Sequence, residues 1–160
     1  MSLISVEWNG FIKMCCENYP AESCAFLFAK APFKGAEKWF VFPVENIAVD
    51  KVNQWSPHPQ ELKLVKEKAK DQRLTPIGNV HSHTLPESFK TASKLERGQM
   101  INEHMFPSDV DLRYARRFNN IVRGILVVDD NAVYECYFHD QFGVNLDLYL
   151  NGITEGGSEK

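Results

Sequence analysis

The residues of this chain best suited to chemistry include two histidines, His81 and His83, which lie at the end of an apolar run. On a strand, residues two apart point to the same face, so both imidazoles could bind one divalent cation. Neutral imidazole is a good zinc ligand. Taken alone, the pattern is short, and a pair of surface histidines in a loop is its more common explanation.

An aspartate further along the chain offers a third ligand. Asp111 follows Ser108 by three residues, which is close to a capping box at the start of a helix. A carboxylate is also favoured there by the helix dipole. The pattern alone therefore predicts only a helix start. A carboxylate held in a first helical turn is nevertheless rigidly aimed, and it can serve as a metal ligand as well.

Glu22 precedes an apolar segment, and alone it would be taken for a solvated surface residue. Together these residues could form a catalytic zinc site, because two histidines and one aspartate leave the fourth position of a zinc ion to water. Zinc lowers the pKa of that water to about 7. A carboxylate that is not a ligand, such as Glu22, could then move the proton. The hydroxyl of Ser108 could stabilise an oxyanion.

The order Glu … His-Ser-His … Pro-Ser-x-x-Asp resembles the JAMM signature of the JAB/MPN/Mov34 metalloprotease family. Further segments resemble the family, at 20–27, 42–46 and 76–81. The resemblance covers residues 1–138. It implies a single α/β (α+β) domain, with a curved, mostly antiparallel sheet flanked by helices and a fold related to that of cytidine deaminases.

The same resemblance implies a hydrolase that cleaves a peptide or isopeptide bond with the help of zinc. The implied zinc ligands are His81, His83 and Asp111. The implied catalytic residues are Glu22, as general acid/base, and Ser108, as hydrogen-bond donor to the intermediate. A ubiquitin-like protein is a candidate partner, cleaved near its C-terminus. Some family members have lost these groups and act only as binding or scaffold modules, and others occur among phage tail-assembly proteins.

One departure from the family pattern is large. Twenty-four residues separate His83 from Ser108, many more than the family pattern has, so we interpret 84–107 as an insertion at the rim of the site. Three interpretations stay open. The insertion could be a substrate-sensing lid, an autoinhibitory loop in which Glu103 or His104 reaches the metal, or a passive surface loop.

The elements that must position these residues alternate between helices and strands, which indicates a mixed sheet flanked by helices. We predict helices at 5–18, 54–72 and 108–118, and strands at 24–29, 38–44, 77–81, 121–128, 132–138 and 142–150. Ser56 is the predicted cap of the second helix, with Pro57 in its first turn. Residues 85–106 show little periodicity. We expect one domain over 1–150 and a disordered tail over 151–160.

The composition and charge of the chain argue against several classes of function. The chain has 160 residues, 44% of them hydrophobic, and a formal net charge of -3. Nucleic-acid binders usually carry a clustered excess of basic residues, and this chain is slightly acidic, so we expect no nucleic-acid partner. The sequence has no apolar run long enough for a membrane span, and its four cysteines lack Cys-x-x-Cys spacing. Its first seven residues lack a basic region followed by an apolar one, so we expect no secretory leader. We expect a cytoplasmic protein with free thiols. A zinc deaminase would need a Cys-x-x-Cys ligand pair, which is missing.

Overall fold

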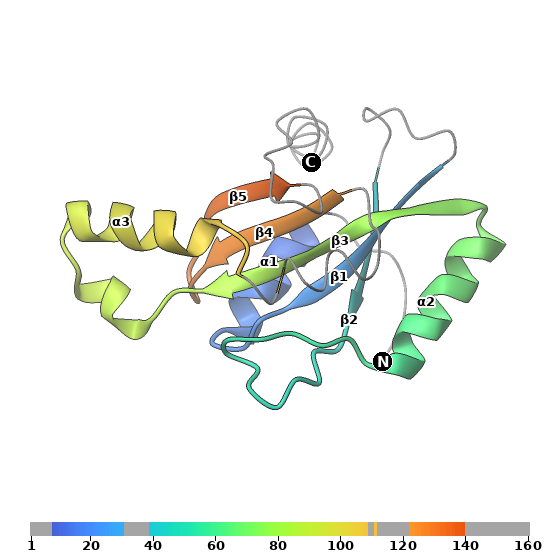
Figure 1. Ribbon diagram of the computed structural model, residues 1–160, viewed down its shortest axis with the longest axis horizontal. Coiled ribbons are helices and arrows are strands. Elements are labelled where there is room, and N and C mark those ends of the chain that lie inside the picture. The colour runs from blue at the N-terminus through green and yellow to red at the C-terminus, as the bar shows by residue number, and fades with distance from the viewer. Residues whose placement is uncertain (1–7, 31–38, 109–110, 112–121, 140–160) are drawn as a thin grey trace.

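The centre of the protein is a five-stranded sheet in the order β2-β1-β3-β4-β5 (Figure 1). The computed structural model describes residues 8–30, 39–108, 111 and 122–139. The strands are β1 (Cys24–Lys30), β2 (Phe40–Val44), β3 (Leu74–Thr84), β4 (Val122–Val128) and β5 (Val133–His139). Only β3 and β4 pair in parallel, and the other neighbours are antiparallel. The predicted mixed, mostly antiparallel sheet is confirmed.

Helices cover both faces of this sheet (Figure 1). The helices are α1 (Trp8–Asn18), α2 (Pro59–Asp71) and α3 (Lys94–Met105), together with the short 3-10 helix η1 (Glu87–Thr91). Phe11 of α1 packs with Val80 of β3 on one face. Val65 of α2 packs with Cys24 of β1 on the other, and α3 packs beside Ile125 on that same face. Among the helices of the described residues, none has the length and apolar character needed to cross a membrane.

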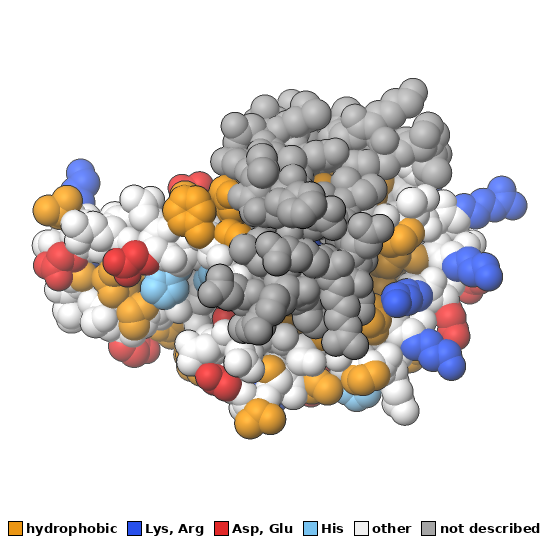
Figure 2. Space-filling model, in the orientation of Figure 1, with side chains coloured by type: hydrophobic (Ala, Val, Ile, Leu, Met, Phe, Trp, Pro, Cys, Tyr) orange, Lys and Arg blue, Asp and Glu red, His pale blue; other side chains and the backbone are white. Residues whose placement is uncertain are grey.

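The second helix is amphipathic. Val65 and Ala69 are buried against the sheet. Its other side is rich in lysine, and Figure 2 shows these basic side chains gathered at the end of the molecule that α2 occupies. Apolar residues four apart on a helix lie on one face, so this spacing explains how α2 packs.

β3 is the central strand, and a close approach to β4 begins at Gly78. A Cβ built at Gly78 would lie 1.7 Å from the carbonyl oxygen of Val122. No other residue fits there without a shift of the backbone. From this point the two strands run in register, and His81 pairs with Ile125. The strand that carries both histidines is therefore held on both sides, by β1 and by β4.

The predicted start of the second helix is wrong. The N-cap is His58, whose Nδ1 accepts the N–H of Gln60 at 3.2 Å, rather than Ser56. Ser56 is not free to begin a helix, because its carbonyl accepts the N–H of Ile47 and Pro57 forms an isolated bridge to Asn46. Contacts with a distant segment thus override the local capping pattern.

The region without clear periodicity contains a helix that we did not predict. α3 begins with a complete capping box, in which Ser93 and Glu96 bind each other's backbone N–H groups. The Ser-x-x-Glu spacing could have indicated it. No residue of α3 is buried, so its sequence has only a weak amphipathic pattern, and for this reason we did not predict the helix. β3 is also longer than predicted, so His83 lies within the strand together with His81.

Several predictions hold and others lie outside the described residues. β1, β2, β4 and β5 match the predicted strands closely, and all four cysteines are free thiols. Untested are the first residues of the helix at 5–18, most of the helix at 108–118, the strand at 142–150, the domain boundary at 150 and the tail at 151–160.

Candidate metal centre

Two imidazoles meet on one face of the central strand. His81 and His83 alternate with residues whose side chains face α1, so both project from the opposite face. Their Nε2 atoms lie 3.0 Å apart. His81 is only 3% exposed, and its ring lies against the ring of Trp55 with centroids 5.3 Å apart. The pair is therefore held by the sheet, not by a loop.

Asp111 reaches both histidines. Its Oδ1 lies 3.3 Å from Nε2 of His81, and its Oδ2 lies 3.1 Å from Nε2 of His83. The carboxylate is aimed by a reciprocal pair of hydrogen bonds: the Ser108 N–H donates to Asp111 Oδ2 at 2.9 Å, and the Asp111 N–H donates to Ser108 Oγ at 3.1 Å. The predicted capping pattern and the ligand geometry thus occur together.

The three side chains fit a metal ion. His81, His83 and Asp111 form the group of potential ligands found among the described residues. In a tetrahedral zinc site with bonds of about 2.0–2.1 Å, ligand atoms lie roughly 3.3 Å apart. The two Nε2 atoms lie 3.0 Å apart, close to that value, and each lies 3.1 or 3.3 Å from one of the two oxygens of Asp111. Three protein ligands would leave one position open, as in catalytic zinc sites.

The charge states also suit a cation. Burial lowers the pKa of His81, which favours its neutral form. Burial alone would raise the pKa of Asp111, but the two neighbouring imidazoles hold it well below its ordinary value. A neutral imidazole beside an ionised carboxylate is what a zinc ion requires of its ligands.

Glu22 is a buried carboxyl group next to the ligands. It is 5% exposed. Ser23, the next residue, donates its N–H to Ser82 Oγ at 2.8 Å and accepts the Ser82 N–H at 2.9 Å, which fixes Glu22 beside the histidine strand. Burial, followed by the charges of Asp111 and Asp50, raises the pKa of Glu22 to about 9. The notion of a solvated surface glutamate is therefore wrong.

Sequence reasoning missed Asn46, which organises the loop beside Glu22. Its Nδ2 donates to the carbonyl of Glu22 at 2.9 Å and to that of Gln54 at 3.0 Å. Its Oδ1 accepts the N–H groups of Ala48 and Ser56, each at 3.0 Å. In the sequence, Asn46 belongs to the segment 42–46 that resembles the family, and nothing there indicated its hydrogen bonds. A buried amide with all of its hydrogen bonds satisfied rigidifies its surroundings.

The insertion is a folded unit in contact with the site. Phe89 and Leu85 are buried with Ile125 of β4, so this part of the chain packs against the sheet and is not a loop lying free on the surface. The autoinhibitory arrangement is not observed either. The ring of His104 binds the carbonyl of Met100 in its own helix, and Glu103 is exposed. What reaches the site is the backbone: Nδ1 of His83 lies 2.6 Å from the carbonyl oxygen of His104.

One of two solved structures compared with this protein, the one with the higher TM-score, supports this fold. A protein from Desulfitobacterium hafniense, known from a solution structure, aligns over 86% of this chain and 82% of its own, with 17% identity and a TM-score of 0.53. A JAB1/MPN domain protein from Archaeoglobus fulgidus aligns over 86% and 85%, with 16% identity and a TM-score of 0.46. No curated protein matches the chain significantly.

The fold and the clustered side chains define an α+β domain with a His-His-Asp group suited to a metal ion. The family of prokaryotic homologues of the JAB domain matches residues 8–89, half of the chain. The chain belongs to this family. The matched part includes Glu22 and both histidines, and the predicted family is confirmed.

Proposed function

We propose that this protein is a zinc-dependent hydrolase of peptide or isopeptide bonds. The observation that carries the proposal is the convergence of three ligand groups beside one buried carboxyl group. His81, His83 and Asp111 would hold the metal. Bound zinc supplies Lewis acidity and lowers the pKa of a coordinated water. The side chains of the protein do the remaining chemistry.

Glu22 is suited to move the proton. During hydrolysis, a water oxygen adds to the carbonyl carbon, Glu22 takes a proton from that water, and it then returns the proton to the leaving nitrogen as the C–N bond breaks. A carboxyl group with a raised pKa is a competent proton donor near neutral pH. A cation at the ligands would favour the ionised form of Glu22, which is the form that accepts the proton.

Ser108 is suited to stabilise the intermediate. Its Oγ accepts the N–H of Asp111, so the orientation of the hydroxyl group is tied to the ligand turn. The hydroxyl hydrogen is left to donate to a developing oxyanion. Loss of one such donor costs about 10²- to 10³-fold in kcat in a well-studied protease, which sets the scale expected here.

The substrate class follows from the family resemblance. A peptide amide, or the C-terminal tail of a ubiquitin-like protein, is the candidate. The alternative is a catalytically silent binding module of the same fold. The retained ligands and Glu22 favour the enzyme, because a scaffold has no use for a buried acid beside a ligand triad.

Cleavage by the zinc-loaded protein tests this function. The substrates are a ubiquitin whose C-terminus carries a fluorogenic amine and a short fluorogenic peptide amide. We expect the wild type to release the amine, and Glu22→Gln to retain zinc while its kcat falls by at least about 10²-fold, since proton transfer contributes on that scale. Glu67→Gln, on the exposed side of α2, is the matched control and should remain active. Zinc binding without cleavage of either substrate would favour the binding module, and a fully active Glu22→Gln would contradict the role of Glu22.

A further inference from the structure

We propose that the helical insertion is an integral part of the metal centre, because α3 positions the backbone carbonyl of His104 to select the tautomer of His83. This inference rests on the proposed metal site. In this role the insertion positions the ligand His83, which the location of the insertion at the rim of the site does not by itself imply. The residues that carry it are His83, His104 and the side chains that fasten the end of α3.

The hydrogen bond between His83 and His104 has only one direction. A carbonyl oxygen can only accept, so Nδ1 of His83 carries the hydrogen across the 2.6 Å contact. In a neutral imidazole the other nitrogen, Nε2, is then unprotonated. That atom faces His81 and Asp111. The lone pairs of Nε2 and of the Asp111 carboxylate thus point into one space, which a cation stabilises.

The carbonyl of His104 is available because it lies in the last turn of α3. The last four carbonyls of a helix have no partner within the helix. α3 ends at Met105, so the His104 carbonyl is one of them. His83 satisfies it, and the helix end supplies the acceptor that ligand histidines usually find in a carboxylate or a backbone carbonyl.

Apolar contacts fasten this end of α3 to the sheet. Met105 packs against the buried cluster that contains Ile125 and Tyr137. The ring of Phe106 lies edge-on to the ring of Tyr137, with centroids 5.4 Å apart. Phe106 is 54% exposed, so this contact holds the helix end from the outside. Moving Phe106 would release the His104 carbonyl without opening the core.

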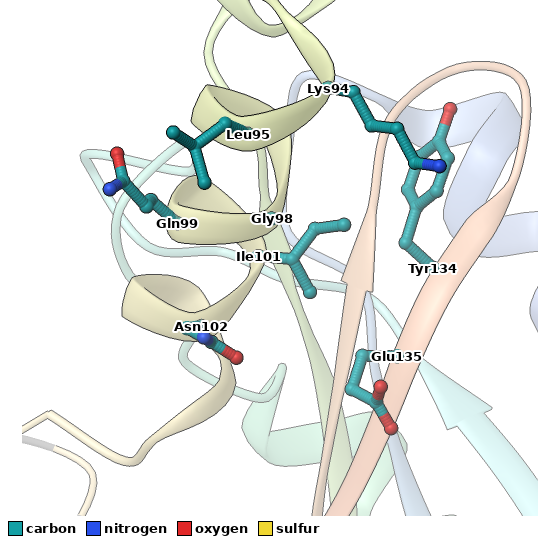
Figure 3. A pocket seen from close by; sticks show the side chains of 8 residues that line it. All are labelled: Lys94, Leu95, Gly98, Gln99, Ile101, Asn102, Tyr134 and Glu135. Atoms are coloured by element: carbon teal, nitrogen blue, oxygen red, sulfur yellow. The ribbon is translucent and has the colours of Figure 1, made fainter.

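An open pocket of about 760 Å³ lies between α3 and β5 (Figure 3), and its lining begins at Lys94, the first residue of the helix. Figure 3 shows Leu95 on α3, and Tyr134 and Glu135 on β5 across the pocket. Leu95 is 75% exposed. It is a matched control for Phe106, since both are exposed apolar residues of the same unit but only Phe106 lies next to the His104 end.

The start of the insertion is tied down as well. The Leu85 N–H donates to the carbonyl of Val128 at 2.8 Å, and the hydroxyl of Tyr19 donates to the carbonyl of Leu85. Lys90 forms an ion pair with Asp130 at 2.9 Å. The insertion is therefore attached at both ends, at β4 and at the ligand His83, as a positioning element must be.

Zinc affinity, measured by competition with a chromophoric chelator, tests the inference. We expect Phe106→Ala to bind zinc about 10- to 100-fold more weakly than the wild type, the usual effect of removing an outer partner of a ligand histidine. Phe106→Tyr and Leu95→Ala should bind like the wild type. Equal affinity of Phe106→Ala and the wild type would overturn the inference. A wild type that binds no zinc would instead overturn the proposed function.

A second measurement needs no variant, which protects the test against a Phe106→Ala protein that fails to fold. Long-range ¹H–¹⁵N spectra of the zinc-loaded wild type report which nitrogen of each histidine carries hydrogen. We expect a protonated Nδ1 and a metal-bound Nε2 at His83. Coordination of zinc through Nδ1 would contradict the positioning role of His104, even with the metal site intact.

Discussion

Glu22 holds a carboxyl group in surroundings that oppose its ionisation. The carboxyl is buried, and the carboxylates of Asp111 and Asp50 are close enough to raise its pKa further, to about 9 from an ordinary value of 4.5. The folded protein therefore binds one more proton than the unfolded chain between these two values. In metal-depleted protein, Glu22 consequently makes the free energy of unfolding fall as the pH rises through that window.

Glu22→Gln should remove this pH dependence. Glutamine has the shape of a protonated glutamate and cannot ionise. The metal-depleted variant should match the wild type near pH 4.5 and exceed it by up to about 6 kcal/mol near pH 9, since a difference of one in pKa corresponds to about 1.4 kcal/mol. Urea unfolding at about pH 5 and about pH 8.5 measures the difference. A gap of the same size at both pH values would contradict the raised pKa.

The histidines and Asp111 show which parts of the site can be predicted from sequence. The two-residue period of a strand is local, so the shared face of His81 and His83 followed directly from their spacing. The turn that aims Asp111 was equally local, since it needs only Ser108 three residues earlier. Only the family resemblance predicted that Asp111 and the two histidines lie together, because no local pattern relates residues so far apart in the sequence.

At the scale of elements, local patterns predicted strands better than helix ends. β1, β2, β4 and β5 followed from apolar runs bounded by turns. The start of α2 was misplaced because Ser56 and Pro57 are engaged by the segment that follows β2. The backbone contact from His104 to His83 could not be predicted, since a carbonyl has the same chemistry at every position and only tertiary packing aims it.

The loop between β2 and α2 depends on Asn46, and a substitution there tests this at the scale of the element. Asn46→Ala removes four hydrogen bonds and leaves the Glu22 carbonyl without its donor. We expect a loss of about 2–4 kcal/mol in the free energy of unfolding, given about 1 kcal/mol per bond. Urea unfolding measures it.

Asn53 provides the control for that substitution. It lies in the same loop but is exposed, and within the described part of the chain its side chain forms a hydrogen bond only with Asp50. Asn53→Ala should therefore change the free energy of unfolding by less than about 0.5 kcal/mol, as is usual at the surface. If the two variants lost the same stability, Asn46 would not be the organising residue.

At the scale of the whole molecule, the sheet brings three distant parts of the chain to one place. Glu22 precedes β1, the histidines lie on β3, and Asp111 follows the insertion. Because β1 and β3 are paired neighbours, Glu22 and the histidines are fixed relative to one another. Asp111 follows the insertion in the chain, and His83 depends on the insertion for the carbonyl that binds its Nδ1. We therefore expect the metal centre to be the feature most sensitive to changes there.

Zinc stoichiometry, measured by elemental analysis after exhaustive dialysis together with titration of the affinity, tests the central claim most directly. The wild type should bind one equivalent, and Asp111→Ala should bind more than about 100-fold more weakly, beyond the effect of losing an outer partner. Asp71→Ala, an exposed carboxylate at the end of α2, should bind like the wild type. A wild type that retains no zinc, or an Asp111→Ala protein that binds it as tightly as the wild type, would contradict the account.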